Sequence, residues 1–389
     1  MVKYVNNYFL YSMKENILFI VFALEHYNPL GVIRNLGESG VNPIFIAIKH
    51  HGKIASLSKY LKKVHYADTI EEGYDILIRE YGDCYKSGDK PFLLFSDDRS
   101  VGFFDTKYEE VKDKFYFFNA GKTGRITHFI DKFNILEIAQ RHGLKTLKSC
   151  VTKNGVIPDD IEYPVITKSI SPNEGGWKSD VHICYSEAEL KEAFNNILSD
   201  EVLIQKYIEK KNEMTYEGFS INHGDEVLVG IQCEYNYLIK GYYSPYHSVK
   251  SPEDASIVSS VKSLFKEIGF EGMFEVEFLI DQDDTCYFSE INFRNSPWSY
   301  SATKSGMFLP YAWCMSMRKG TIDDSILKHI DEPYNAMVEP IDFGKRVEEG
   351  LISMAEWLKD FKEAKCTYYY NSEDLAPYEA LYSNWDNVK

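Results

Sequence analysis

The 389-residue sequence predicts an α/β fold that opens with a parallel sheet and continues into mixed α+β structure. Two observations predict it. Continuous apolar runs are typical of strands buried on both faces, and they occur at residues 16–23, 42–48 and 91–96. Farther along, residues 274–280 and 286–293 alternate apolar and polar side chains around a short polar turn. That alternation predicts a β-hairpin, with Phe274, Val276, Phe278 and Ile280 on one face of its first strand.

The first 120 residues alternate strands with helices, which favours an open parallel sheet. We expect a loop over residues 24–31, then a helix to about Gly40, and another helix over residues 70–81. There is no GxGxxG dinucleotide motif. Asp97, Asp98 and Arg99 follow a predicted strand, where ligands of such sheets often bind. A solvated loop explains these three residues equally well.

The remaining chain divides into three further parts. A helix is expected from Asp131 to His142, stopped by Gly143. Other helices are expected over residues 187–198 and, in a polar and aromatic tail, over residues 346–361. The predicted units are residues 1–120 (N-terminal α/β domain), 121–210 (lid), 211–325 (hairpin-containing unit) and 326–389 (C-terminal appendage).

Composition excludes several classes of partner. The formal net charge of −16 argues against non-specific nucleic-acid binding and against docking on an anionic membrane. The seven cysteines include no CxxC pair, so they are expected as free thiols in a reducing compartment. No apolar run is long enough for a transmembrane helix, and the first 15 residues lack a signal-peptide layout. We therefore expect a cytoplasmic protein without membrane insertion.

The hairpin carries the strongest chemical signal. If its turn is centred near Asp283, Glu277 lies almost opposite Glu290, and Asn292 and Arg294 share a strand face with Glu290. Directly opposed like charges repel at a separation of about 5 Å. Two carboxylates and an amide oxygen on a stiff ladder suit a divalent cation such as magnesium. A solvated polar face on a two-sided sheet is the alternative interpretation.

Three features between residues 160 and 215 suit a nucleotide. Lys168 closes a short apolar strand, where an ammonium can meet a phosphate. The loop after that strand contains Gly175 and Gly176, whose backbone N–H groups can face phosphates. The strand from residue 201 to 208 can pair with the adenine edge, and a carboxylate follows it. The alternatives are a surface lysine, a simple turn, and an edge strand before a charged turn.

In type and order, these features resemble the ATP-grasp superfamily of carboxylate–amine ligases. The family pattern of an acidic residue on one strand and Glu-x-Asn-x-Arg on the next is matched by Glu277 and by residues 290–294. Residues 299–306 are similar to the small-residue helix that follows this motif in carbamoyl phosphate synthetase-type members. The resemblance covers residues 14–320. It implies the ATP-grasp fold behind an N-terminal open parallel α/β domain.

The resemblance also implies ATP and magnesium (or manganese) as cofactors and a role for each matching residue. Arg294 faces the acyl phosphate and, with Lys168, serves catalysis. The nucleotide is held by Lys132, Lys168, Gly175, Gly176, Gln205, Lys206, Tyr207, Ile208 and Glu213, and the metal by Glu277, Glu290 and Asn292. The loop departs from the family by including Pro172 and Trp177, which puts its phosphate contacts in doubt.

A ligase of this kind joins small-molecule carboxylate and amine substrates through an acyl phosphate. Residues 91–98, 115–119, 131–133 and 137–144 are similar to the D-aspartate ligase type, which adds an amino acid to a bacterial cell-envelope precursor. The alternatives are an enzyme that activates bicarbonate and a non-catalytic nucleotide-binding regulator. His247 and Lys250 either face the substrate carboxylate or lie in a surface loop. A homo-oligomer is also expected.

Overall fold

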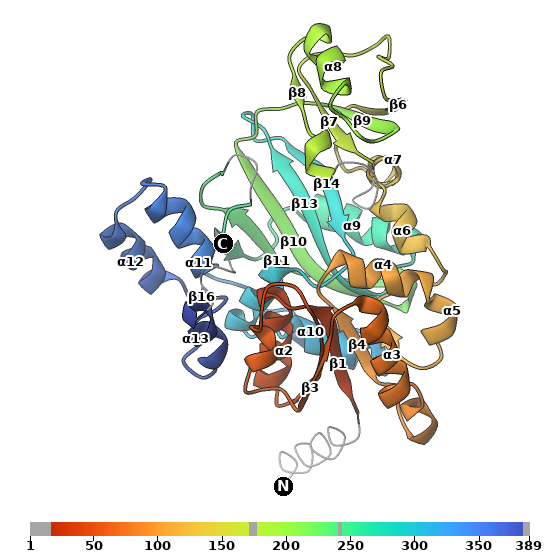
Figure 1. Cartoon of the computed structure of the whole chain (residues 1–389), viewed down its shortest axis with the longest axis vertical. Helices are drawn as coiled ribbons and strands as arrows, with labels where there is room; N and C mark the ends of the chain where they lie inside the picture. Colours follow the sequence, from red (N-terminus) through yellow and green to blue (C-terminus); the bar gives the residue numbers. More distant parts are fainter. Residues whose placement is uncertain (1–16, 171–176, 240–242, 384–389) are drawn as a thin grey trace.

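The computed structural model describes residues 17–170, 177–239 and 243–383, and three sheets organise them (Figure 1). A parallel sheet forms the base, a long mixed sheet lies in the middle, and a small antiparallel sheet lies at the opposite end from the base. Among these residues, no helix is both long and apolar enough to cross a bilayer. All seven cysteines are free, and four of them are buried.

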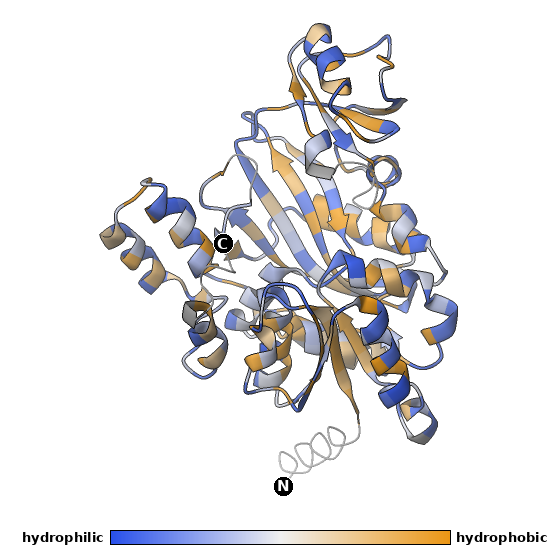
Figure 2. Ribbon diagram, in the orientation of Figure 1, coloured by the Kyte–Doolittle hydropathy of each residue, from blue (hydrophilic) through white to orange (hydrophobic). Residues whose placement is uncertain are grey.

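The base is a five-stranded parallel sheet whose strand order is β3-β2-β1-β4-β5. Its strands are β1 (Phe19–Leu24), β2 (Ile44–Ile48), β3 (Lys63–Ala67), β4 (Phe92–Phe95) and β5 (Tyr116–Phe117). The helices of this unit are α2 (Tyr27–Glu38), α3 (Ile70–Tyr81), α4 (Asp98–Thr106) and α5 (Tyr108–Val111). Strands β2 and β4 are buried throughout, as their apolar runs predict, and the sheet is largely orange in Figure 2. This confirms the open parallel sheet.

One expectation for this unit is wrong. Residues 24–31 were expected as a loop, but α2 begins at Tyr27, directly after its N-cap His26. Pro29 lies within the first turn, where the missing N–H costs nothing. The early helix start leaves only a tight link after β1. The strand order reverses between β1 and β4, so both strands end beside the crevice where open α/β sheets bind ligands.

The small sheet is an antiparallel lid with strand order β6-β9-β7-β8. Its elements are β6 (Ser149–Lys153), β7 (Val165–Ser169), β8 (Ile183–Cys184), β9 (Glu201–Lys206) and α8 (Glu187–Phe194). Helix α8 ends four residues before the expected residue 198. The lid has an apolar core of its own, which includes Val165, Leu190 and Val202. Helices α6 (Arg125–Ile130) and α7 (Lys132–Arg141) precede it, and Asp131 caps α7 by accepting from the N–H groups of residues 133 and 134.

The central sheet has seven strands in the order β14-β13-β10-β11-β12-β15-β16. They are β10 (Asn212–Ile221), β11 (Glu226–Tyr235), β12 (Tyr246–Lys250), β13 (Gly272–Ile280), β14 (Cys286–Asn292), β15 (Tyr334–Met337) and β16 (Cys366–Thr367). Helices α9 (Ala255–Ile268), α10 (Leu309–Lys319) and the 3₁₀ helix η5 (Pro297–Ser305) accompany it. Short helical turns are η1 (Ala55–Leu57), η2 (Cys84–Ser87), η3 (Trp177–Asp180), η4 (Asn222–Gly224) and η6 (Asp324–Ile326). Strands β13 and β14 form the predicted hairpin.

Residues 326–389, expected as an appendage, place β15 and β16 in this central sheet. They also contain α11 (Glu339–Phe343), the π-helical turn η7 (Gly344–Glu348), α12 (Met354–Glu363) and α13 (Ala376–Ser383). The single helix expected over residues 346–361 is therefore wrong. Gly350 breaks it with a φ of +75°, and Ser353 starts α12 with a capping box to Glu356.

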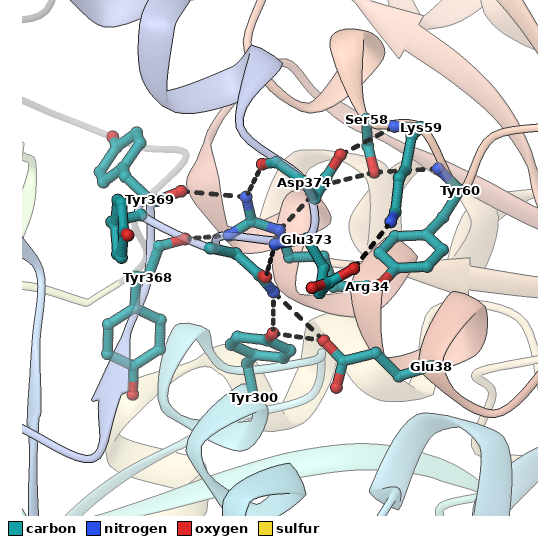
Figure 3. A network of polar contacts seen from close by, with 12 residues as sticks. Arg34, Glu38, Ser58, Lys59, Tyr60, Tyr300, Tyr368, Tyr369, Glu373 and Asp374 are labelled. Atoms are coloured by element: carbon teal, nitrogen blue, oxygen red, sulfur yellow. Dashed lines mark hydrogen bonds and ion pairs between the residues drawn. The ribbon is translucent and has the colours of Figure 1, made fainter.

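A buried ion pair holds the C-terminal segment against the base (Figure 3). The guanidinium of Arg34, on α2, lies 2.9 Å from a carboxylate oxygen of Asp374. It also donates to the carbonyl oxygens of Tyr368 and Tyr369, at 3.0 and 2.9 Å. Asp374 in turn accepts from the Ser58 hydroxyl at 2.8 Å. Through these hydrogen bonds, the buried ion pair ties α2 to the C-terminal segment.

Candidate active site

The candidate site is built on two rows of polar side chains that cross β10, β13 and β14. In one row, Glu277 pairs directly with Glu290 on one side and with Thr215 on the other. In the neighbouring row, Glu275 lies between Glu217 and Asn292. The residues between the rows point to the opposite face of the sheet, where Tyr216, Val276 and Ile291 are buried in the core. The predicted register of Glu277 opposite Glu290 is thus present.

Hydrogen bonds connect the two rows. The Asn292 amide nitrogen donates to Glu275 at 2.9 Å and to Glu277 at 2.7 Å, so its carbonyl oxygen stays available as a ligand atom. Burial raises the pKa of Glu277 well above its ordinary value, and the Glu290 carboxylate raises it further. The pKa of Glu290 is lowered instead, chiefly by the charge of Lys132. The opposed carboxylates therefore depend on cations for their ionisation.

Two lysines supply positive charge from other elements. Lys132, at the start of α7, places its ammonium nitrogen 2.5 Å from a carboxylate oxygen of Glu290. Lys168, near the end of β7 in the lid, donates to the side-chain oxygen of Gln205 on β9 at 3.0 Å. Burial, followed by repulsion from Lys132, lowers the pKa of Lys168 to about 8. Two ammonium groups that repel each other are suited to bind one anion that carries several negative charges.

These residues fit a divalent cation. Glu277, Glu290 and Asn292 offer two carboxylates and an amide oxygen, the hard oxygen ligands that magnesium prefers. Glu290 is compensated by Lys132, whereas burial and the Glu290 charge raise the pKa of Glu277, so a bound cation would favour the ionised form of Glu277. The described part of the chain holds no cluster of three or more His, Cys, Asp or Glu side chains arranged for a metal. A magnesium ion shared with phosphate oxygens needs fewer protein carboxylates than that.

Arg294 links the hairpin to the base of the molecule. It follows β14, and its Nε lies 3.1 Å from a carboxylate oxygen of Asp98 at the start of α4. Its Nη1 lies 3.5 Å from Glu275. Asp98 belongs to the strand-end residues that the sequence marked as a candidate ligand loop. The guanidinium therefore has a fixed position between the carboxylate rows and the carboxyl end of the parallel sheet.

The other predicted nucleotide residues lie along the strand that leaves the lid. Gln205 bridges Lys168 and the Ser149 hydroxyl, to which its amide donates at 3.0 Å. The Lys206 ammonium turns to the carbonyl oxygens of Glu162 and Tyr163, while the Tyr207 N–H donates to Pro164. Ile208 follows in the link to β10, and Glu213 forms an ion pair with Lys210. Gly175 and Gly176 lie outside the described residues.

A cavity of about 880 Å³ opens beside these residues. Glu275, Glu277 and Arg294 form its inner wall, and the links after β1 and β4 form another. The third wall comes from the C-terminal segment and includes Pro340, Lys345 and Tyr369. The parallel-sheet unit, the central sheet and the C-terminal segment therefore meet around one space, next to the candidate metal residues.

Comparison with known proteins agrees with this arrangement. Residues 127–305 match the family model for the ATP-binding domain of the carbamoyl-phosphate synthase L chain. Over 87% of this chain and 86% of the other, the structure is similar to the ADP complex of N5-carboxyaminoimidazole synthetase from Staphylococcus aureus, with a TM-score of 0.63 and 17% identity. The chain has the ATP-grasp fold.

Curated relatives match this chain in sequence over shorter stretches. The 2-oxoglutarate carboxylase small subunit of Hydrogenobacter thermophilus is 26% identical over 187 residues, which are 42% of this chain and 38% of that protein. The D-alanine–D-alanine ligase of Thermosipho africanus is 26% identical over 169 residues, 40% of this chain and 42% of that protein. The chain thus spans about two fifths of the length of these relatives.

The structure adds residues to the candidate site and separates others from it. Neither Glu217 nor the C-terminal wall of the cavity was predicted from the sequence, because pairing between strands far apart in sequence brings them to the site. His247 is buried, and its ring nitrogen lies 3.2 Å from the Tyr368 hydroxyl. Burial lowers the pKa of His247 to about 3. Lys250 pairs with Glu234 and Glu253. Neither His247 nor Lys250 belongs to the cavity lining.

Proposed function

We propose that the chain is an ATP- and magnesium-dependent carboxylate–amine ligase that works through an acyl phosphate. One observation carries this proposal. Glu277, a candidate metal ligand, and Arg294 both line the cavity, so an acceptor bound there would lie beside the residues that would hold the metal. A carboxylate in that position is within reach of the γ-phosphate.

The proposed reaction has two steps. A carboxylate oxygen of the substrate attacks the γ-phosphorus of ATP, and ADP leaves, which forms the acyl phosphate. An amine nitrogen then attacks the acyl carbon, phosphate leaves, and the nitrogen loses a proton as the amide forms. Bound magnesium would offset charge on the phosphate oxygens. The work of the protein is positioning and charge neutralisation, because phosphoryl transfer needs little covalent help.

Each charged residue has a proposed part in these steps. Lys132 and Lys168 neutralise the phosphates during transfer. Glu277, Glu290 and Asn292 hold the metal, while Gln205, Lys206, Tyr207, Ile208 and Glu213 surround the adenosine. The planar fork of Arg294, held by Asp98 and Glu275, keeps the acyl-phosphate oxygens in place.

A bicarbonate-activating enzyme is the second candidate, because one curated relative is a carboxylase subunit. The cavity favours the ligase. Its volume of about 880 Å³ is in the range of pockets for drug-sized ligands, which is far more than bicarbonate fills. An acceptor with a substantial body beyond its carboxylate suits this space. Three statements stay predictions: that the acceptor is a cell-envelope precursor, that the protein is cytoplasmic, and that it forms a homo-oligomer.

Phosphate release from ATP and magnesium tests the proposal. The assay is screened against amino acids, carboxylated cell-envelope precursors and bicarbonate, singly and in pairs. We expect turnover that needs both a carboxylate and an amine. Turnover stimulated by bicarbonate alone would support the second candidate, and ATP binding without turnover across the panel would support a regulator.

A further inference from the structure

Three histidines gather at the end of the cavity formed by the parallel sheet. His26 follows β1, and His50 and His51 follow β2. The ring centroids of His50 and His51 lie 3.7 Å apart, and those of His26 and His51 lie 5.8 Å apart. All three side chains line the cavity. We call this group the histidine corner.

Glu25 fixes the loop that carries two of these rings. Its side chain is buried, and its carboxylate accepts from the N–H groups of Ile54, Ala55 and Ser56 at 3.3, 3.0 and 3.0 Å. The backbone N–H of His51 also donates to the Glu25 carbonyl oxygen at 3.4 Å. Because Glu25 directly precedes His26, one residue sets the position of all three rings. The fold itself therefore holds the histidine corner together.

The charges around the histidine corner favour an anion. Burial is the main cause that lowers the pKa of His26 and of His50. The charge of Arg294 lowers the pKa of His26 further, and the charge of Arg99, on α4, does the same for His50. The nearby carboxylates are occupied, because Asp98 pairs with Arg294, and Asp97 accepts from the N–H groups of Leu24 and Ser100. Glu25 is likewise satisfied by three N–H groups. Arg294 already has two carboxylate partners, Asp98 and Glu275. The donors left at the histidine corner are therefore the imidazole rings and the guanidinium of Arg99, which forms no ion pair among the described residues.

The backbone adds to this preference. Helix α2 begins at the histidine corner, its N-cap His26 makes no side-chain cap, and its first turn contains no acidic residue. The N–H groups of a helix start favour negative charge. A metal is a poorer match, since the described residues contain no His, Cys, Asp or Glu cluster arranged to hold one.

We propose that the histidine corner binds an anionic group, a phosphate or a carboxylate, that the acceptor substrate carries in addition to its reacting carboxylate. This inference rests on the proposed ligase function, because it describes the acceptor of that reaction. The reacting carboxylate lies at the Arg294 end of the cavity, and the second anion lies at the carboxyl ends of β1 and β2. The acceptor is therefore an elongated molecule with at least two anionic groups.

The protonation of the corner gives this site a pH dependence. Burial and the neighbouring histidines lower the pKa of His26 to about 3, and burial also lowers the pKa of His50. A bound anion favours the protonated ring and raises these pKa values, so binding takes up protons. By linkage, the anion must bind more tightly as the pH falls. The other charged groups that line the cavity come from the base, the hairpin and the C-terminal segment: Asp97, Asp98, Glu275, Glu277, Arg294, Lys345, Glu348 and Glu349.

Imidazole NMR on the full chain tests the proposal. The ring-nitrogen signals are followed during titration with inorganic phosphate and, separately, with succinate. Saturating magnesium and a non-hydrolysable ATP analogue fill the nucleotide site throughout. We expect a saturable shift of the His26 signal and an affinity that rises as the pH falls toward the lowered pKa of His26. A response to phosphate alone, or to succinate alone, identifies the anionic group.

A double variant and a matched control make the test specific. The double variant His50→Asn with His51→Asn should lower the affinity for the anion at least about tenfold, while His26 stays as the reporter. Both rings are exposed in the cavity, so the fold should survive, and a thermal melt checks this. His329→Asn, which changes an exposed histidine on the surface, should leave the affinity unchanged. No saturable shift of His26, or the same affinity in the double variant, would overturn the proposal.

Turnover adds an independent readout once the carboxylate substrate is known. The double variant should raise the KM for the acceptor more than it lowers kcat, since the histidines contact a remote group. Hydroxylamine capture of the acyl phosphate, measured at saturating acceptor, does not depend on these histidines. If the anion titration shows no binding, the ligase proposal still stands. If no hydroxamate forms, the anion titration still shows whether the histidine corner binds an anion.

Discussion

At the scale of single residues, Lys168 lies where the lid meets the carboxylates of the central sheet. Its ammonium is bonded to Gln205 and repelled by Lys132, and its pKa is lowered to about 8. The phosphates of ATP favour the protonated amine, so binding restores the proton that the free site loses above that pH. The protein environment thus favours loss of the Lys168 proton, and bound ATP favours its retention.

Lys168→Ala should lower the affinity for ATP at least about tenfold and the affinity for adenosine less than about twofold, because only a phosphate contact is lost. In the wild type, ATP affinity should fall as the pH rises through about 8, and this dependence should vanish in the variant. Calorimetric titration at several pH values measures both effects. Lys211→Ala, which breaks an exposed pair with Asp284, is the control. Equal losses for ATP and adenosine would place Lys168 away from the phosphates.

The metal residues allow a second prediction at this scale. Glu290→Gln combined with Asn292→Ala removes one carboxylate and the amide oxygen, and should lower magnesium-dependent turnover about a hundredfold. Phosphate release as a function of magnesium concentration measures it, with circular dichroism to check the fold. Asp283→Asn, in the exposed turn of the same hairpin, should behave as wild type. Wild-type turnover in the double variant would refute the metal assignment.

At the scale of elements, the polar face of β10, β13 and β14 concentrates negative charge inside the protein. Glu217 is fully buried beside Glu275, and one of its carboxylate oxygens has no hydrogen-bond partner. Burial, and then the Glu275 charge, raises the pKa of Glu217 well above its ordinary value. The native state therefore holds this proton more tightly than the unfolded state does. Folding stability contributed by this group must fall as the pH rises above the ordinary range of a glutamate.

Glu217→Gln should consequently stabilise the fold by about 1 kcal/mol at pH 8. The gain should disappear near pH 5, where the native carboxyl is already protonated. The new amide can donate to Glu275, so the substitution leaves that carboxylate with a partner. Urea unfolding at both pH values measures the difference. A gain that is the same at pH 5 and pH 8 would show that the charge of Glu217 is not the cause.

The sequence predicts this element well where the signal is local. Alternation along residues 274–293 predicts the hairpin, its polar face and the opposition of Glu277 and Glu290. It does not predict the bulge after Glu277, where the register shifts by one residue. Nor does it reveal Glu217, because the pairing of β10 with β13 joins residues more than fifty positions apart. Local periodicity carries no information about such partners.

At the scale of the whole molecule, the C-terminal segment closes the cavity because it is anchored to the base. Arg34 and Asp374 are buried together, and the Glu339 carboxylate accepts from the N–H groups of residues 368–370. Composition suggested only a polar tail here. Its role depends on β15 joining β12, and on a single arginine more than 300 residues away in sequence. Such contacts leave no periodic pattern in the sequence.

Asp374→Ala should destabilise the protein by about 3–5 kcal/mol, since it leaves the buried Arg34 guanidinium without its partner. It should also raise the KM for the acceptor, because Tyr369 and the wall at residues 340–349 lose their anchor. The neighbouring Glu373→Ala breaks only an exposed pair with Lys59 and should cost less than about 1 kcal/mol. Urea unfolding and steady-state kinetics measure these effects. Equal costs in the two variants would show that the buried pair is not the anchor.

The most direct test of the ligase account is capture of the acyl phosphate with hydroxylamine. With ATP, magnesium and the accepted carboxylate, the wild type should form a hydroxamate. Arg294→Ala should still bind ATP but lose the hydroxamate, and Arg294→Lys should restore little of it, because an ammonium lacks the planar fork. A phosphorylated product that resists hydroxylamine would contradict the account, since a stable phosphoester means that this fold acts as a kinase.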